Sequence, residues 1–458
     1  METPVLIVGG GPVGLALAGD LGWRGLSCLQ IERSDGAVTQ PKMDMVHIRT
    51  MEFCRRWGIV NEVEQSGYNR AHAQDNVWVT ALAGGYELGR EVFPNCIDEK
   101  CPPQSPQKRE RAPQNFFDPA LARFVRTFPD VEQRYFTELV DFTEDDNGVS
   151  AIIRNVKTGE TENVRAQYLI GCDGAGSFVR EKLGITMTGN PVLTYTTNVV
   201  FRSRDLEQVQ DIPSAYRYIF VDEEGTWATL VAIDGRDHFR FSMVGNREKR
   251  QLTDDELVAA VRYEAERKPV AARNVAEAAR NLARMLETRS RKPPKEIFEA
   301  GPAGEKARKD YGDWYTERMS HEWFTIGIQI GYRYDGSPIC VPDETTPPPF
   351  EVANYVQTSH AGARAPHAWL KDGRSMLDLF GKGFVLLQIG SNPLDARALV
   401  DAVATRRVPL QVIALDEPDV VKLYEKKLVL VRPDGHVAWR GDAVPTDSLR
   451  LIDTVRGA

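Results

Sequence analysis

Short apolar runs alternate with longer amphipathic stretches along most of this chain, a pattern typical of an α/β protein. The first apolar run, Pro4–Val8, leads through a glycine-rich turn into an apolar stretch from Leu15 to Trp23. A second run covers Cys28–Ile31. This order predicts a strand, a helix that ends at Arg24-Gly25, and a second strand.

The same reasoning predicts the elements that follow. Spaced apolar residues from Met51 to Ile59 predict an amphipathic helix ended by Gly58. Alternation on both sides of Gly84-Gly85 predicts a β-hairpin, and Gln114–Leu121 opens a helix that we expect to be capped near Asp118. The region 191–246 is rich in alternating strands.

A separate α/β unit is predicted from about Gly362, after a proline-rich linker at Asp343–Phe350. Its expected strands are Met376–Gly381, Phe384–Ile389, Leu410–Leu415 and Leu428–Arg440, the last folded into a hairpin at Pro433-Asp434-Gly435.

Composition narrows the class of protein. The 458 residues suffice for two or three domains, and 42% hydrophobic and 27% charged residues are ordinary for a globular protein. A net charge of −8 argues against nucleic acid or an anionic membrane as partner, and the longest uncharged run, Thr3–Gly19, is too short and glycine-rich to span a bilayer. Six scattered cysteines predict free thiols in a reducing cytoplasm, and neither cysteines nor histidines have metal-site spacing.

The turn after the first strand carries a G-x-G-x-x-G motif, formed by Gly9, Gly11 and Gly14. Such glycines let a pyrophosphate approach the backbone, and the following helix directs unpaired N–H groups at the phosphates. Glu32 lies eighteen positions after Gly14, where a carboxylate would hold a ribose hydroxyl. The motif therefore predicts a dinucleotide site, against the alternative of a glycine-rich turn in an ordinary βαβ unit.

A second signature, Asp173-Gly174, follows the apolar segment Ala166–Gly171. That position is the carboxyl edge of the predicted sheet, where ligands bind in open α/β folds. The alternative is an Asp-Gly turn with a helix cap at Ser177. Together with the glycine motif, Asp173 favours a ligand site.

These two signatures, with 41–58 and 114–121, resemble the FAD-dependent aromatic-ring hydroxylases, the single-component flavoprotein monooxygenases related to phenol hydroxylase. The resemblance implies an α/β fold with a Rossmann-like FAD-binding domain, an inserted antiparallel substrate sheet and a C-terminal thioredoxin-like α/β domain. The implied boundaries are 1–75 with 100–185 for the FAD-binding domain, 76–99 with 186–250 for the sheet, 251–342 for a helical return segment and 355–458 for the thioredoxin-like domain.

The resemblance also implies an activity: FAD reduced by NAD(P)H would activate O₂ for insertion into a small phenolic or polyketide-like aromatic. The residues implied to contact FAD are Gly9, Gly11, Gly14, Glu32, Arg33, Arg49, Gln114 and Asp173. Asp44 resembles the acidic residue that the family places near the substrate hydroxyl, and the alternative is that it only caps a loop. The alternative for Arg49 is a solvated charge at the start of a helix. The last domain lacks cysteine, so its implied role is packing or formation of a homodimer rather than dithiol chemistry.

One part of the family pattern is missing. The family has a second flavin motif, an apolar strand ending in Gly-Asp-Ala-Ala-His, but here Arg262 runs directly into Tyr263, in a segment that resembles a later part of the family sequence. The remaining Gly-Asp pairs, Gly19-Asp20, Gly312-Asp313 and Gly441-Asp442, lack that context. A deletion near 262/263 therefore leaves a second hypothesis, a catalytically impaired relative that keeps only the adenosine half-site or a subunit role. An NAD-dependent dehydrogenase fits the Asp-Gly signature less well.

Overall fold

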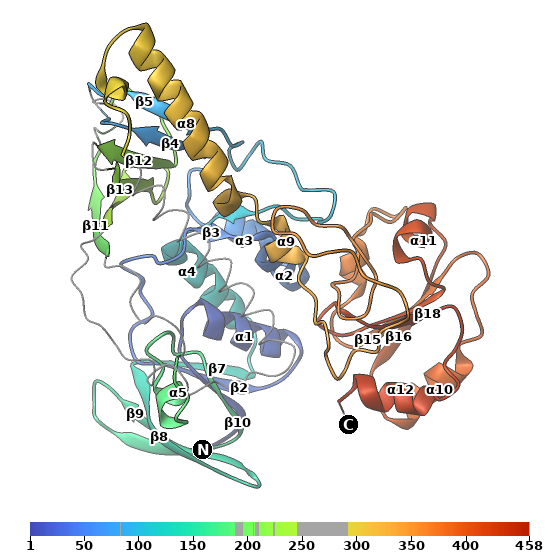
Figure 1. Cartoon of the computed structure of the whole chain (residues 1–458). Helices are drawn as coiled ribbons and strands as arrows, with labels where there is room; N and C mark the ends of the chain where they lie inside the picture. The colour runs from blue at the N-terminus through green and yellow to red at the C-terminus, as the bar shows by residue number, and fades with distance from the viewer. Residues whose placement is uncertain are drawn as a thin grey trace.

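The computed structural model of the chain describes residues 1–82, 84–187, 196–204, 206, 210–222, 225–244 and 292–457. Two six-stranded sheets form the N-terminal part, and a smaller α/β unit follows on the right of Figure 1. The first part of the expected helical return segment, residues 251–291, lies outside the described residues, and so does the break at 262/263.

The first sheet has the strand order β7-β2-β1-β10-β9-β8. Strands β1 (Glu2–Val8), β2 (Cys28–Glu32), β7 (Val131–Tyr135) and β10 (Thr161–Gly171) run parallel, and β8 (Thr137–Asp145) and β9 (Gly148–Asn155) extend the sheet antiparallel. Because β1 lies between β2 and β10, the strand order reverses beside β1. A parallel sheet opens a ligand crevice at such a point, outside the carboxyl ends of its strands.

Apolar side chains explain how this sheet is covered. Ile7 packs on one face with Leu15 of helix α1 (Pro12–Trp23), and the same core includes α2 (Ile48–Trp57) and α4 (Gln114–Val125). Leu6 and Val8 point to the other face, into a core that β8, β9 and β10 share. Because successive side chains of a strand point to opposite faces, β1 contributes to the core on each side of the sheet.

The helix boundaries largely follow the sequence. Arg24 caps α1, and Gly58 adopts the left-handed conformation that ends α2. The cap predicted at Asp118 is wrong: α4 begins at Gln114, after Pro113, and Asp118 lies inside the helix, where its carboxylate accepts a hydrogen bond from Gln114. The short helices α3 (Val60–Glu64) and α5 (Phe178–Lys182) complete this part, with Ser177 capping α5.

The second sheet has the order β11-β14-β13-β12-β4-β5 and unites strands from distant parts of the sequence. Its strands are β4 (Asn76–Val79), β5 (Glu87–Glu91), β11 (Thr196–Arg202), β12 (Arg217–Asp222), β13 (Gly225–Ala232) and β14 (His238–Val244). All neighbours are antiparallel except β4 and β12, which pair parallel. The two-stranded ribbon of β3 (Met45–Val46) and β6 (Glu110–Arg111) lies outside both sheets.

The long helix α8 (Pro302–Trp323) packs on β5, as Figure 1 shows in yellow. Trp78 of β4 and Tyr315 of α8 meet in that core, with ring centroids 5.4 Å apart. A 3₁₀ turn, η2 (Lys295–Phe298), precedes α8, and α9 (Ile326–Ile330) follows it.

The C-terminal unit has the sheet order β16-β15-β17-β18, with helices on both faces. Its elements are η3 (Met376–Leu379), β15 (Phe384–Ile389), α10 (Arg397–Thr405), β16 (Leu410–Leu415), α11 (Pro418–Tyr424), β17 (Leu428–Val431), β18 (Val437–Gly441) and α12 (Ser448–Val455). The strand predicted at Met376–Gly381 is wrong, because Ser375 and Asp378 form a reciprocal capping box that begins the 3₁₀ turn η3.

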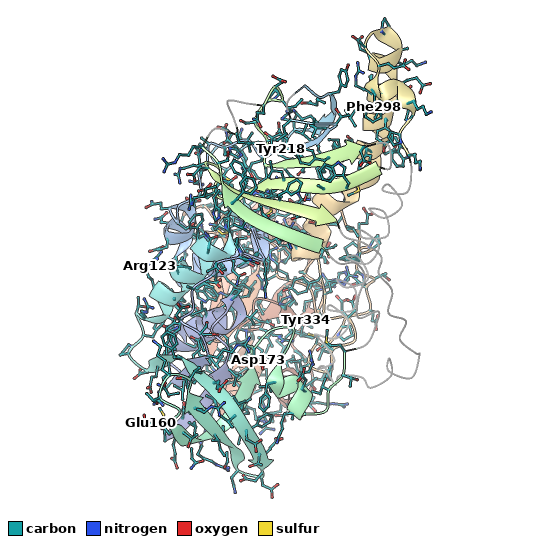
Figure 2. The ribbon with its side chains drawn as sticks, turned by 90° about the vertical axis from the view of Figure 1, so that its left-hand side faces the viewer. Arg123, Glu160, Asp173, Tyr218, Phe298 and Tyr334 are labelled. Carbon is teal, nitrogen blue, oxygen red and sulfur yellow. The ribbon has the colours of Figure 1, made fainter. Side chains whose placement is uncertain are left out.

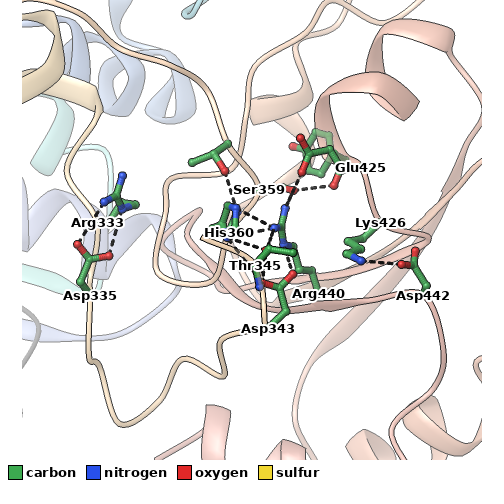
Figure 3. Close-up of polar contacts among 12 residues, drawn as sticks. Arg333, Asp335, Asp343, Thr345, Ser359, His360, Glu425, Lys426, Arg440 and Asp442 are labelled. Atoms are coloured by element: carbon green, nitrogen blue, oxygen red, sulfur yellow. Dashed lines mark hydrogen bonds and ion pairs between the residues drawn. The ribbon is translucent and has the colours of Figure 1, made fainter. Parts of the chain in front are cut away.

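A buried arginine holds the linker against this unit. Arg440 of β18 is 2% exposed and donates hydrogen bonds to Asp343, Thr345 and Ser359 (Figure 3). Buried charges need such partners, so the polar cluster fixes the path of the linker at 343–345.

Three further properties bear on function. None of the six cysteines, all within the described residues, forms a disulfide. No helix among the described residues is long and apolar enough to cross a membrane. Those residues also contain no group of three or more His, Cys, Asp or Glu side chains arranged to hold a metal ion.

Candidate active site

The glycine motif forms a tight turn at the carboxyl end of β1. Gly9 has φ +115°, and a Cβ there would collide with the carbonyl oxygen of Cys172 on the neighbouring strand segment. A Cβ at Gly14 would collide with the carbonyl oxygen of Gly9. Gly9 and Gly14 are therefore required by the fold itself.

Gly11 differs from both. Its φ of −75° suits any residue, and no other atom of the described structure lies within 4 Å of the position its Cβ would take. Gly11 is also the residue before helix α1, whose first-turn N–H groups have no helical acceptor. The space at Gly11 thus fits a phosphate group that approaches the helix N-terminus.

Glu32 closes this turn from the end of β2. One carboxylate oxygen accepts the Gly10 N–H at 2.7 Å, and the other accepts the Ser34 N–H at 2.8 Å. Burial raises the pKa of Glu32, but the hydrogen bonds from Ser34 and Gly10 outweigh it and hold the pKa below its ordinary value. Glu32 is therefore an ionised acceptor, as contact with ribose hydroxyls requires.

Asp173 lies beside the same turn, because Cys172 N–H bonds to Val8 and so continues the pairing of β10 with β1. Its Oδ2 accepts the Val179 N–H at 3.2 Å, but its Oδ1 is buried and finds no partner among the described residues. Figure 2 shows Asp173 near the lower sheet, far below Tyr218 of the upper sheet. An orphaned acceptor beside an open glycine fits a dinucleotide that carries hydroxyl groups, such as FAD.

The structure gives the other predicted FAD contacts different surroundings. Gln114 accepts the Lys42 N–H at 3.2 Å, so it holds the loop before Asp44. Arg33 is exposed. Arg49 is paired with Glu52 at 2.9 Å and donates at 3.0 Å to the carbonyl of Asp434 in the C-terminal unit.

Asp44 lies in a cavity of about 160 Å³ between the FAD-binding part and the second sheet. Tyr216, just before β12, donates a hydrogen bond to its Oδ2, and Arg111 approaches its Oδ1 at 3.5 Å. The guanidinium carbon of Arg111 also lies 3.4 Å from the centre of the Tyr216 ring. The lining residues are Asp44, Met45, His47, Gln74, Asn76, Phe93, Arg109, Arg111, Tyr216, Arg217, Thr325 and Gln329.

The electrostatics of this cavity keep Asp44 ionised. Burial raises its pKa, but Arg111 and the hydrogen bond from Tyr216 outweigh burial and leave the pKa below its ordinary value. Burial also raises the pKa of Tyr216 to about 12, so Tyr216 keeps its proton. Burial and the nearby arginines Arg109 and Arg111 lower the pKa of His47, which favours its neutral form.

Sequence reasoning singled out Asp44, and the strand-rich region 191–246 contains the aromatic residues Tyr216, Tyr218 and Trp227. The structure brings only Tyr216 to Asp44, whereas the Tyr218 hydroxyl accepts the Ala215 N–H and Trp227 packs with Phe220. Arg111 carried no local signal, because it lies at the end of a proline-rich loop.

Comparison with known proteins identifies the family. A model described as an FAD binding domain matches residues 2–303, and one described as the C-terminal part of aromatic-ring hydroxylases matches 358–456. The chain belongs to the FAD-dependent aromatic-ring hydroxylases. The sequence expectation of family and fold class, including the FAD-binding and C-terminal domains, is thereby confirmed.

Several members of these hydroxylases are similar over the whole chain. The FAD-dependent monooxygenase apdD of Emericella nidulans is 28% identical, covering 96% of this chain and 88% of its own length. The 4-methyl-5-nitrocatechol 5-monooxygenase of a Burkholderia species is 25% identical, covering 99% and 98%. The solved structure of the rebeccamycin biosynthetic enzyme RebC with reduced flavin is 31% identical, with a TM-score of 0.87 and coverage of 100% and 99%.

These matches also bear on the missing motif. The matched stretch extends over 553 positions for apdD, although this chain has 458 residues. At least 95 residues of that relative therefore have no counterpart here. The three Gly-Asp pairs of this chain lie in α1, in α8 and at the end of β18, and none of them follows a strand of the first sheet.

Proposed function

We propose that this hydroxylase uses FAD and NAD(P)H to hydroxylate a small phenolic or polyketide-like aromatic in the cavity that holds Asp44. The observation that carries the proposal is the hydrogen bond from Tyr216 to Asp44, which joins a loop of the FAD-binding part to the second sheet. Bound FAD, reduced by NAD(P)H, would supply the activated oxygen. The open space at Gly11 and the orphaned Oδ1 of Asp173 support FAD as the cofactor.

The chain's own residues have distinct tasks in this proposal. Tyr216 donates its hydrogen to Asp44, so a lone pair of its phenol oxygen can accept the hydroxyl hydrogen of a bound phenol. Arg111 keeps Asp44 ionised, and the negative carboxylate in turn makes the Tyr216 oxygen a better acceptor. The pair orients the hydroxyl and helps to draw off its proton, which makes the ring more electron-rich.

The names of the relatives support an aromatic substrate. They include Tetracenomycin B2 monooxygenase-dioxygenase of Streptomyces olivaceus, 28% identical over 99% of this chain. The six cysteines without a disulfide support a reducing compartment such as the cytoplasm.

Purified protein tests the proposal directly. We expect a stoichiometric flavin spectrum and NAD(P)H oxidation that phenols stimulate, with a hydroxylated product detected by mass spectrometry. Asp44→Asn should keep the flavin and lose most of the product. A flavin-loaded protein that releases no hydroxylated product from any phenol would refute the assignment.

A second candidate function is a catalytically impaired relative. The observation in its favour is the absence of a Gly-Asp motif after a strand of the first sheet, together with the residues present in apdD and absent here. Such a protein would keep the adenosine contacts of Glu32 and the glycine turn. The distinguishing result is a colourless protein that stays inert toward NAD(P)H but binds ADP in a calorimetric titration.

A further inference from the structure

A second cavity, of about 210 Å³, lies where helix α2 meets the C-terminal unit. Helix α2 contributes Arg49, Glu52, Phe53, Arg55 and Arg56 to its lining. The C-terminal unit contributes Leu377, Asp378, Phe380 and Gly435. Three arginines and two carboxylates thus face one space between two domains.

The two carboxylates of the lining are already fully engaged. Glu52 is 7% exposed, and its oxygens accept hydrogen bonds from Arg49, from Ser105 and from Arg364 of the C-terminal unit. Both carboxylate oxygens of Asp378 accept hydrogen bonds from Arg55, at 2.7 and 2.8 Å. Neither carboxylate has capacity left for a further cation.

The carboxylates just beyond the lining are engaged as well. Asp20 accepts from Trp57 with one oxygen and from Arg24 with the other. Asp434 accepts the His436 N–H with one oxygen and an Arg432 N–H with the other. Among the described residues, none of these four carboxylates accepts a hydrogen bond from Arg56.

Arg56 is the arginine that remains. In the described structure it has no carboxylate within ion-pair distance, and its buried Nη1 finds no acceptor. The buried Nε of Arg49, which lines the same cavity, also finds none among the described residues. Both guanidinium groups flank the Phe53 ring, at 5.3 and 4.6 Å.

This arrangement leaves Arg56 without a direct ion pair in a partly enclosed space, although Asp20 and Asp434 attract it from further away. Burial, with Arg49 nearby, lowers the pKa of Arg56 to about 10, as expected for a cation without a partner. Buried unpaired charge is costly, and an oxyanion that accepts from both guanidinium groups would relieve that cost. The cavity is far larger than the space that a single water needs.

We propose that the cavity between α2 and the C-terminal unit is a binding site for a small tetrahedral oxyanion, of which inorganic phosphate is the representative. Arg56 and Arg49 are its donors, and Gly435 in the turn between β17 and β18 borders it from the other domain. A bound oxyanion stabilises the docking of the two domains. Arg49 is also one of the FAD contacts that the family resemblance implies, but in the structure it bonds to Glu52 and to the carbonyl of Asp434. Arg56 is not among those implied contacts, so it is the donor that distinguishes this site from the flavin site.

Isothermal titration calorimetry with inorganic phosphate tests the site on the full chain saturated with FAD, at constant ionic strength balanced with chloride. Saturation with FAD keeps phosphate away from the glycine turn. We expect one saturable site in the unmodified chain and a dissociation constant at least about tenfold higher in Arg56→Gln, since a charge-assisted donor is lost. Arg56→Lys should retain part of the affinity.

Arg406→Gln is the matched control, because Arg406 is paired with Asp453 on α12, away from the cavity, and the substitution removes the same charge. It should bind phosphate as the unmodified chain does. Circular dichroism verifies that each variant is folded. No saturable heat in the unmodified chain, or equal affinity in Arg56→Gln, would overturn the proposal, and water would then be the occupant.

Discussion

Replacing Gly11 by valine separates cofactor binding from folding more cleanly than any other change in the glycine turn. The backbone of Gly11, with φ −75° and ψ −176°, is open to any residue, and the new Cβ meets no atom within 4 Å in the described structure. Glycine is a modest helix N-cap, so its loss should cost about 1 kcal/mol of stability or less. The folded state should therefore survive.

Cofactor binding should respond much more strongly. The valine side chain would occupy the space through which a pyrophosphate reaches the first-turn N–H groups of α1. Loss of two charge-assisted hydrogen bonds, at about 1.5 kcal/mol each, amounts to about 3 kcal/mol. That corresponds to a Kd for FAD higher by roughly 150-fold.

The assay is quenching of FAD fluorescence on titration with the apoprotein, with thermal unfolding followed by circular dichroism. Gly9→Ala is the contrasting variant, because its Cβ would collide with Cys172 at φ +115° and should lower the melting temperature markedly. An unchanged Kd for FAD in a folded Gly11→Val chain would refute the assignment of this turn to the pyrophosphate.

The remaining predictions concern the half-buried carboxylate of Asp44 and the buried carboxylate of Glu52. Tyr216→Phe removes the hydrogen-bond donor to Asp44 and should lower the rate of hydroxylation about 10- to 100-fold, while the Kd for FAD stays unchanged. An unaltered rate of product formation would count against a catalytic role of the Asp44–Tyr216 pair. Because the folded-state pKa of Asp44 is lowered, its stabilising contribution should be complete above the ordinary Asp pKa of about 3.9 and should disappear as the pH falls through the lower folded-state value. Urea unfolding of the unmodified chain and Asp44→Asn should accordingly differ at pH 7 and converge in acid; a constant difference would contradict this. Glu52→Gln leaves Arg49 and Arg364 without their shared carboxylate, and the free energy of unfolding measured with a chemical denaturant should fall by about 3 to 5 kcal/mol. A fall below about 1 kcal/mol would show that other groups neutralise the two arginines.

The local features of this protein could be predicted from the sequence because neighbouring residues decide them. The glycine turn, the end of α2 at Gly58 and the cap at Ser177 depend on backbone conformation within a few residues. Even so, Met376–Gly381 has the apolar character of a strand and forms a 3₁₀ turn, because two side chains of a capping box compete with strand pairing.

The candidate catalytic contact could not be predicted in this way. Asp44 and Tyr216 lie 172 residues apart, and Arg111 reaches them from the short ribbon strand β6. Alternation predicted strands in the region that contains Tyr216, but not which of several aromatics would face the carboxylate. In the structure the Tyr216 N–H bonds to the carbonyl of Asp75, just before β4, and the Tyr216 hydroxyl reaches Asp44.

The sequence alone determined the family, the glycine turn and the fold class, since motifs and periodicity are local properties of the chain. Tertiary structure decided where charges meet. It paired Arg49 with Glu52 and with the carbonyl of Asp434, 385 residues away, and left Arg56 without a carboxylate between two domains. The physical reason is that the energy of a charge depends on every group within a few ångströms, and folding brings those groups from all parts of the sequence.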